Sequence, residues 1–220
     1  MAPAALHRVF DRLFDAYGRQ EWWPADSRLE VMLGAVLTQN TSWINVEHAL
    51  RRLKSAAVMR PGVLLDLGED RLADLIRPAG YYRVKARRLR NLLDALQRQG
   101  GEPAWERLET EELRRRLLAV NGVGPETADD ILLYAFHRPV FVVDAYTRRL
   151  FSRLDWVSGD AGYETLRHAV QAAARADTDS GFFQELHALI VHHAKRHCAV
   201  KPRCAGCALR NLCAFRDPPG

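Results

Sequence analysis

Lysine is scarce in this sequence of 220 residues, which has 28 arginines and only 4 lysines among its 32 basic side chains. An excess of arginine of this size is typical of a chain encoded by a GC-rich genome. Any reaction that needs a side-chain amine is therefore restricted to Lys54, Lys85, Lys195 and Lys201. The net charge of +5 and the isoelectric point of about 9.2 are compatible with a polyanionic partner, although they do not require one.

Long hydrophobic runs are absent. No stretch reaches the roughly 18 apolar residues that suggest a membrane-spanning helix, and residues 1–14 lack the uninterrupted apolar core of a signal peptide. The 14 glycines and 10 prolines are scattered along the chain, which argues against a long disordered tract. The sequence therefore predicts a folded cytoplasmic protein with no membrane partner.

Cysteine is missing from the first 197 residues and then occurs four times in the last 23. A secreted disulfide framework would spread its cysteines along a shorter chain, so this crowding indicates a metal or cluster site in a reducing compartment. The ligands would be Cys198, Cys204, Cys207 and Cys213, spaced C-x5-C-x2-C-x5-C. Four soft thiolates in one loop suit an iron–sulfur cluster. Zinc is the alternative, although four-cysteine zinc sites usually show two C-x2-C pairs and this sequence has one.

Hydrophobic side chains recur at spacings of three and four residues, which predicts an all-α fold. The first helix covers residues 6–17 and stops at Gly18, and the second begins after a capping box formed by Ser27 and Glu30. Further helices are expected at about 43–53, 84–99, 145–154, 160–175 and 180–196. Residues 140–143, Val-Phe-Val-Val, have strand-like composition but are too few to build a sheet.

Residues 117–136, LLAVNGVGPETADDILLYAF, hold a tight turn between two predicted helices. The turn consists of Gly122, Val123 and Gly124. Glycine lets a backbone approach a phosphate closely, and successive N–H groups at a helix N-terminus form an anion site. The pattern indicates a helix-hairpin-helix, with an ordinary αα-hairpin as the alternative. Asp144 follows Gly124 by 20 residues, at a position where it would N-cap the next helix.

Several segments carry a family pattern in combination: VMLGAVLTQNTS (31–42), GYYRVKARRL (80–89), VNGVGPETADDILLYA (120–135), FVVDAYTRRL (141–150) and the cysteine run. Together they resemble the helix-hairpin-helix DNA glycosylases of the endonuclease III family, over about residues 22–215. Residues 22–43 and 124–135 are most similar to the branch that includes bacterial 3-methyladenine DNA glycosylases.

The resemblance implies two all-α lobes. A six-helix barrel containing the hairpin would span residues 26–136, and the second lobe would combine residues 1–25 with 137–220. The second lobe would hold a [4Fe-4S] cluster on the four cysteines, although the first cysteine gap is one residue shorter than in endonuclease III itself. The implied partner is double-stranded DNA with a damaged base, bound by a monomer in the bacterial cytoplasm, at the nucleoid.

The role implied for the cluster is structural, since it would fix a loop bearing Lys201, Arg203 and Arg210 beside a DNA backbone. Four histidines lie close to the cysteines in the sequence. They are interpreted as helix-face or solvated side chains, because four thiolates already complete a site: His187, His192, His193 and His197.

Two acidic residues are the catalytic candidates that the resemblance implies. The carboxylate of Asp144 would stabilise an oxocarbenium-like transition state and orient a water. Glu126 stands where bifunctional members of the family carry a lysine that forms a Schiff base. A carboxylate cannot form one, so the resemblance transfers glycosylase chemistry without lyase chemistry. Glu126 either holds a water or is a solvated acid favoured by the helix dipole.

Gln39 and Tyr81 match positions at which the family inserts side chains into the duplex while the damaged nucleotide is flipped out. Gln39 ends its predicted helix, where an exposed wedge would fit, and core packing is the alternative for Tyr81.

Three tryptophans flank the predicted helix that ends at Gln39: Trp22, Trp23 and Trp43. Their rings would stack on a positively charged alkylated purine, with core packing again as the alternative.

The sequence therefore predicts a monofunctional DNA glycosylase of base-excision repair that acts on an alkylated purine. One alternative is an endonuclease III-type glycosylase for oxidised pyrimidines with weak or absent lyase activity. Another is a non-catalytic protein that binds lesions without excising them, which the loss of the lysine would fit and the presence of Asp144 opposes. A cluster-bearing redox or structural protein with an incidental hairpin is a third.

Overall fold

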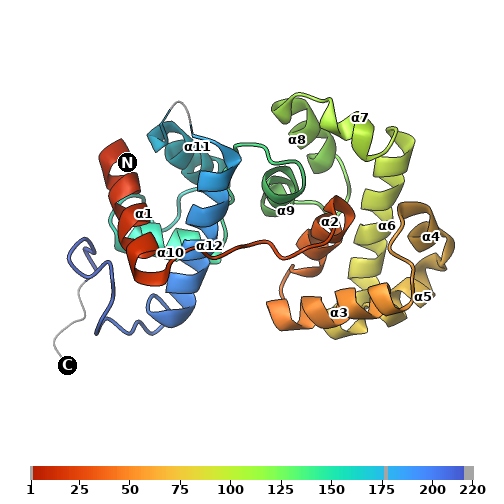
Figure 1. The fold of residues 1–220 in the computed structure, drawn as a ribbon, viewed down its shortest axis with the longest axis horizontal. Helices are drawn as coiled ribbons and strands as arrows, with labels where there is room; N and C mark the ends of the chain where they lie inside the picture. Colours follow the sequence, from red (N-terminus) through yellow and green to blue (C-terminus); the bar gives the residue numbers. More distant parts are fainter. Residues whose placement is uncertain (1, 176–177, 216–220) are drawn as a thin grey trace. The chain divides into compact units, whose positions relative to one another are not determined.

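The computed structural model describes residues 2–175 and 178–215, and all regular secondary structure in this part of the chain is helical (Figure 1). The chain divides into two compact units. One combines Met1–Pro24 with Arg138–Gly220, and the other is Ala25–His137. These bounds lie one residue from those expected from the sequence. Each unit is described by itself below.

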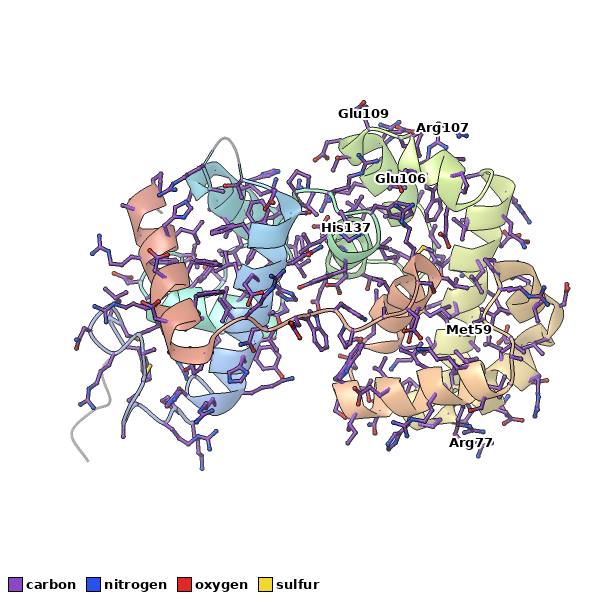
Figure 2. The ribbon with its side chains drawn as sticks, in the orientation of Figure 1. Met59, Arg77, Glu106, Arg107, Glu109 and His137 are labelled. Atoms are coloured by element: carbon purple, nitrogen blue, oxygen red, sulfur yellow. The ribbon has the colours of Figure 1, made fainter. Side chains whose placement is uncertain are left out.

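The Ala25–His137 unit is built around α2 (Arg28–Leu37), whose residues from Leu29 to Leu37 are all buried. A helix that is buried on every side must be enclosed by others, and α2 packs against α3, α6, α9 and η2. Side chains fill the space between these helices (Figure 2). The remaining helices of the unit are α3 (Trp43–Ser55), α4 (Pro61–Asp66), α5 (Gly68–Leu75), η1 (Arg77–Ala79), α6 (Tyr82–Arg98), α7 (Glu102–Glu106), α8 (Thr110–Leu118), α9 (Pro125–Asp130) and the π-helical η2 (Ile131–Ala135).

The other unit contains α1 (Pro3–Tyr17), α10 (Ala145–Arg153), α11 (Tyr163–Ala173) and α12 (Ser180–Arg196). The long helix α12 packs against α1 and α10, and α1 also packs against α11. As predicted, α1 ends at Gly18, whose φ of +67° is a conformation that favours glycine. After α12 the chain continues as a loop that carries the four cysteines.

Two features of the helix starts refine the sequence analysis. Ser27 caps α2, since its Oγ accepts the N–H of Glu30 at 3.2 Å. The reciprocal half of the capping box differs from the prediction, because the Glu30 carboxylate accepts the N–H of Asp26 at 2.8 Å and also pairs with Lys54. Val140 to Val143, the strand-like stretch, forms no strand; all four residues are buried as an irregular segment that leads to α10.

Across the described residues, each helix is too short or too polar to span a lipid bilayer.

Candidate functional site

The hairpin turn between α8 and α9 requires glycine at position 122. Gly122 has a φ of +98°, which strains any other residue. A Cβ at this position would also collide with the Cβ, Cγ and Cδ atoms of Arg88 on α6. The turn is closed by the N–H of Val123, which donates to the carbonyl of Val120 at 3.0 Å, and the Val123 side chain is buried.

Gly124 has a different environment. It N-caps α9 with a φ of −91°, and apart from its two neighbours in the chain no described residue lies within 4 Å of the place where its Cβ would stand. The backbone on this side of the turn is therefore open. Because the first N–H groups of a helix have no carbonyl partner inside it, an open helix start can accept an anion such as a phosphate.

A buried ion pair joins the two helices of the hairpin. The guanidinium of Arg114 on α8 donates to the carboxylate of Asp129 on α9, from Nε to Oδ1 at 2.7 Å and from Nη2 to Oδ2 at 3.2 Å. The Asp129 side chain is completely buried. A two-point contact of this kind fixes the angle between planar groups as well as their distance. This pair was not predictable from the sequence, since the residues at these positions have no distinctive spacing.

Gln39 lies against the hairpin, which differs from the exposed wedge expected from the sequence. It follows the end of α2 and is half-buried. Its Nε2 donates to the carbonyl of Gly122 at 3.1 Å and to the Thr127 hydroxyl at 2.9 Å, and its Oε1 accepts from Arg88. The side chain thus links α2 and α6 to the hairpin. Its insertion into DNA stays a prediction.

Tyr81 is exposed. It precedes α6 with a left-handed backbone, φ +45° and ψ 32°, and 72% of its surface is accessible. The core-packing alternative is therefore wrong for this residue. The neighbouring Tyr82 is half-buried, and the guanidinium of Arg77 lies over its ring at 5.0 Å (Arg77 is labelled in Figure 2).

Asp144 N-caps α10, as predicted from the sequence. Its Oδ1 accepts the N–H of Thr147 at 2.7 Å, and its Oδ2 lies 3.6 Å from Nε2 of His187 on α12. Burial alone would raise the pKa of Asp144, but the contacts with His187 and Thr147 outweigh it and hold the pKa below its ordinary value. The carboxylate is therefore ionised at neutral pH although it is almost completely enclosed.

His187 is a residue whose role the sequence did not reveal. Of the two alternatives, the solvated one is wrong, because 7% of the surface of His187 is accessible; it is a helix-face histidine of α12 that faces Asp144 on α10. No local pattern signals this contact, since α10 and α12 are joined only by tertiary packing. His193 is also buried, between the Tyr17 hydroxyl at 2.8 Å and the Cys207 sulfur at 3.7 Å.

Glu126 is exposed in the first turn of α9, where an acid interacts favourably with the helix dipole. Two of the four lysines are committed to other contacts. Lys54 pairs with Asp26 and Glu30. Lys85 is buried and donates to two backbone carbonyls. The other two belong to α12 and to the cysteine loop, far from the hairpin in sequence: Lys195 and Lys201.

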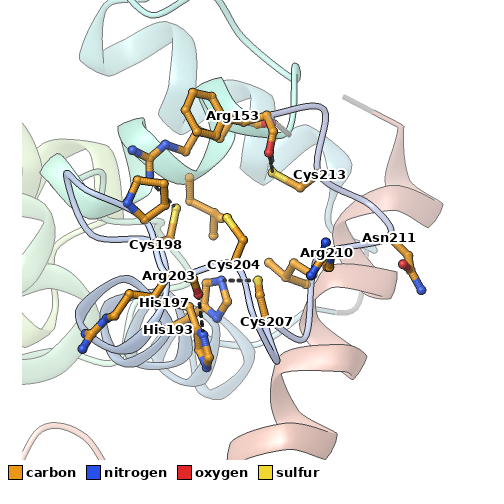
Figure 3. Close-up of a pocket in the computed structure, with 14 residues that line it drawn as sticks. Arg153, His193, His197, Cys198, Arg203, Cys204, Cys207, Arg210, Asn211 and Cys213 are labelled. Carbon is orange, nitrogen blue, oxygen red and sulfur yellow. Dashed lines mark hydrogen bonds between the residues drawn. The ribbon is translucent and has the colours of Figure 1, made fainter. Parts of the chain in front are cut away.

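The four cysteines line one cavity of about 460 Å³ between α10, α12 and the C-terminal loop (Figure 3). None of them forms a disulfide. Arg153 Nη1 donates to the Cys198 sulfur at 3.2 Å, and the Cys213 sulfur donates to the Arg153 carbonyl at 3.3 Å. Burial raises the pKa of the Cys207 and Cys213 thiols, so a thiolate here would need a cationic partner.

The donor set fits a cofactor held by sulfur, but it is not arranged around a single ion. In the described part of the chain, no three His, Cys, Asp or Glu side chains are grouped so that they could hold a metal ion. The cysteines instead surround a space much larger than one ion occupies. A mononuclear zinc site is therefore not preformed, and neither is a compact cluster of ligands.

The tryptophans of the proposed aromatic wall are half-buried. The rings of Trp22 and Trp23 contact each other, with centroids 5.3 Å apart and planes tilted by 46°. Trp43 begins α3, and its indole N–H donates to Glu47 at 2.9 Å.

Comparisons with known proteins agree with this geometry. A family model described as the HhH-GPD superfamily base excision DNA repair protein matches residues 33–175. A protein of Methanocaldococcus jannaschii, named as a candidate DNA repair glycosylase, is 44% identical over 211 residues, which cover 94% of this chain and 95% of the relative. Endonuclease III of Thermotoga maritima is 30% identical over 186 residues, covering 84% and 82% of the two chains.

Two solved structures share the fold. The 3-methyladenine DNA glycosylase of H. pylori, bound to 1,N6-ethenoadenine, superimposes with a TM-score of 0.73 at 26% identity, covering 89% of this chain and 98% of that one. A non-covalent endonuclease III–DNA complex superimposes with a TM-score of 0.81 at 22% identity, covering 97% and 95%. The family match, the length of the alignments and the helical hairpin agree. The chain belongs to the HhH-GPD superfamily of base excision DNA repair proteins, as a DNA repair glycosylase of that superfamily.

Proposed function

We propose that this protein is a monofunctional DNA glycosylase, which flips a damaged base out of double-stranded DNA and removes it by hydrolysis. The observation that carries the proposal is the ionised carboxylate of Asp144 at the start of α10, whose side chain is only 13% accessible. A negative charge kept in a dry environment interacts strongly with a positive charge that develops in the transition state.

Asp144 acts on the bond between the base and the deoxyribose. As that bond breaks, the base departs with the electron pair and C1′ becomes oxocarbenium-like. The carboxylate stabilises this charge and orients a water, whose oxygen forms the new bond to C1′ while its proton passes to the Asp144 carboxylate. The products are the free base and an intact abasic strand. His187 keeps the carboxylate ionised and in place from the opposite side.

The absence of lyase activity follows from residue 126. A Schiff base at C1′ requires an amine, and Glu126 has none to offer. Lys85 is buried and bonded to carbonyls, and Lys54 is held by two carboxylates. Glu126 itself either holds a water or only complements the dipole of α9.

DNA binding uses the hairpin and the two loops beside it. The hairpin backbone at Gly122, Val123 and Gly124, which is open on the side of Gly124, approaches a phosphate and positions the duplex without reading its sequence. Gln39 and Tyr81 fill the space that the flipped nucleotide leaves. The exposure of Tyr81 supports this role. Gln39, bonded to the hairpin, would have to exchange these contacts for contacts with DNA.

An alkylated purine is the proposed substrate. The similarity to a 3-methyladenine DNA glycosylase whose structure holds an ethenoadenine supports it, as do Trp22 and Trp23, whose faces suit a cationic ring. The similarity to endonuclease III favours a second candidate, a glycosylase for oxidised pyrimidines with weak or absent lyase activity. A lesion-binding protein without activity is the third, and the ionised Asp144 argues against it.

Cys198, Cys204, Cys207 and Cys213 are proposed to hold a [4Fe-4S] cluster. The observation that supports this assignment is that all four cysteine thiols line one cavity. The cluster would fix the C-terminal loop, which presents Lys201, Arg203 and Arg210 to a DNA backbone, and it takes no part in the hydrolysis. We further propose that the protein acts as a monomer on DNA in the cytoplasm.

The decisive experiment is excision from a set of duplexes that carry different lesions. The products are read with and without alkali, and in parallel with borohydride. Release of an alkylated purine, strand breakage only after alkali and no borohydride adduct are expected. An adduct or cleavage without alkali would contradict monofunctional chemistry, release of oxidised pyrimidines would favour the second candidate, and binding without any release would favour the third.

A further inference from the structure

Lys85 is a buried lysine that makes two backbone contacts in the core of the Ala25–His137 unit. It lies in the first turn of α6, and 1% of its surface is accessible. Its Nζ donates to the carbonyl of Leu37 at 2.9 Å and to the carbonyl of Ala79 at 2.7 Å. One ammonium thus joins two segments that lie far apart in the sequence.

Both carbonyls belong to the last residue of a helix. Leu37 ends α2, and Ala79 ends η1. The final carbonyls of a helix have no partner within it and carry the negative end of the dipole, so a cation placed there is favourable. Lys85 therefore serves as a shared cap for the C-terminal ends of α2 and η1.

The two capped helices lead into two loops of matching layout. Gln39 comes two residues after Leu37, and Tyr81 comes two residues after Ala79. Each loop also contains a residue other than glycine with a positive φ, +53° at Asn40 and +45° at Tyr81 itself. Backbones in this conformation persist only when their surroundings hold them. The contacts of Lys85 are made at the start of each of these loops.

An apolar side chain in place of Lys85 would stabilise the core of the unit more than the buried ammonium does. Burial, together with the nearby Arg88, lowers the pKa of Lys85 to about 8, which shows that the environment disfavours the charge. A methionine would fill a similar volume without this penalty. The ammonium offers what an apolar chain cannot, namely hydrogen bonds to both carbonyls.

We propose that Lys85 is a positioning residue that holds the Gln39 and Tyr81 loops in the arrangement needed for both to enter the duplex. The inference rests on the proposed function, since it assigns a purpose to the same two side chains. Lys85 itself does not touch DNA, because it is enclosed by the protein. Its main effect is on the step at which space in the duplex is filled, since the phosphate contact proposed above is made by the open backbone at Gly124.

The test compares affinity for a duplex with a tetrahydrofuran abasic analogue and affinity for the matching undamaged duplex. The wild-type preference for the abasic analogue measures insertion, whereas the undamaged duplex measures backbone contacts. Lys85→Met should reduce the preference by about tenfold and leave the affinity for undamaged DNA within about twofold. Lys54→Met is the matched control, since it removes an exposed, ion-paired ammonium from the same unit, and it should leave the preference unchanged.

A double-mutant cycle separates positioning from a loss of stability. Tyr81→Ala should lower the preference by itself, and adding Lys85→Met should then reduce it by less than twofold further, because the positioned side chain is already gone. Lys85→Gln, which keeps two N–H donors in a shorter, neutral chain, should give an intermediate preference and supplies a second variant for the cycle. Folding of each variant is checked by circular dichroism and thermal melting.

Three outcomes would overturn the proposal. They are a folded Lys85→Met protein with the wild-type preference, fully additive losses in the cycle, and failure of both the Met and Gln variants to fold, which would make Lys85 a purely structural residue. A failure of the proposed function is distinguishable, because the wild-type protein would then show no preference for the abasic analogue.

Discussion

At the scale of single residues, Asp144 combines a structural role with a proposed chemical one, and the two can be separated. Asp144→Asn keeps the shape and the cap acceptor but removes the charge. We expect it to lower the single-turnover excision rate by at least about 100-fold, with affinity for the lesion duplex within a few fold of wild type. Since Asn caps a helix about as well as Asp, the start of α10 should stay intact in this variant.

Asp179→Asn provides the matched control for this prediction. Asp179 caps α12 in the same way, with Oδ1 accepting the N–H of Phe182 at 3.0 Å, and it is far from any proposed chemistry in the sequence. Its variant should lose little excision activity. Equal losses of rate in the two variants would mean that Asp144 acts only through the helix it caps.

The lowered pKa of Lys85 predicts how the free energy of unfolding depends on pH. Below pH 8 the ammonium is charged in the folded and the unfolded chain, so its burial penalty is present in full. Between about 8 and the ordinary lysine pKa of 10.5, the folded chain has released a proton that the unfolded chain keeps, and the free energy of unfolding rises with pH. Urea denaturation should show the wild type gaining about 2 kcal/mol over Lys85→Met between pH 7 and pH 9.5. A constant difference between the two proteins would mean that Lys85 keeps an ordinary pKa.

Residues differ in how far their roles follow from sequence. The capping role of Asp144 was predictable because a cap is a local event, set by a polar side chain directly before an amphipathic helix. Its contact with His187 was not, because that partner comes from another helix through tertiary packing. Gln39 shows the same limit, since a position at a helix end suggested exposure while the hairpin in fact binds its amide.

At the scale of elements, the two glycines of the hairpin differ in backbone conformation and in the space around them. Gly124 has an ordinary φ and open space where a Cβ would stand, so the Gly124→Val protein should fold normally. If the open backbone binds phosphate, the added side chain should weaken binding to damaged and undamaged duplex alike, by about tenfold in a fluorescence anisotropy titration. Gly122→Val should instead destabilise the fold by at least about 2 kcal/mol, because of its positive φ and the clash with Arg88.

The salt dependence of DNA affinity is a second test of whether the hairpin binds phosphate. The logarithm of the wild-type affinity should fall linearly with the logarithm of salt concentration, and the slope should be shallower for Gly124→Val if a phosphate contact is lost. If the Gly124→Val protein binds DNA as tightly as the wild type, the hairpin is a purely structural feature.

The turn between α8 and α9 was predictable from its Gly and Pro residues, whereas the π-helical turn of η2 was not, because it lies in a fully buried segment with no local marker.

At the scale of the whole molecule, the all-α class follows from helical periodicity. A division near residues 25 and 137 was expected from the family resemblance alone, and the chain divides into compact units at Pro24 and His137. The arrangement of the cysteines does not follow from their spacing. Spacing alone leaves zinc and an iron–sulfur cluster open, and in the structure the four thiols surround a cavity without forming a compact site for one ion.

The cluster assignment predicts a yellow-brown protein, purified without oxygen, with a broad absorbance near about 400 nm and about four irons per chain. Cys204→Ser should bleach this absorbance and lower the melting temperature, since the loop would lose its anchor. Because the cluster is proposed to act on structure alone, excision per folded molecule should change by less than about threefold in that variant. Stoichiometric zinc in a colourless protein would refute the cluster, and a large loss of rate in folded Cys204→Ser would show that the loop positions DNA for the reaction itself.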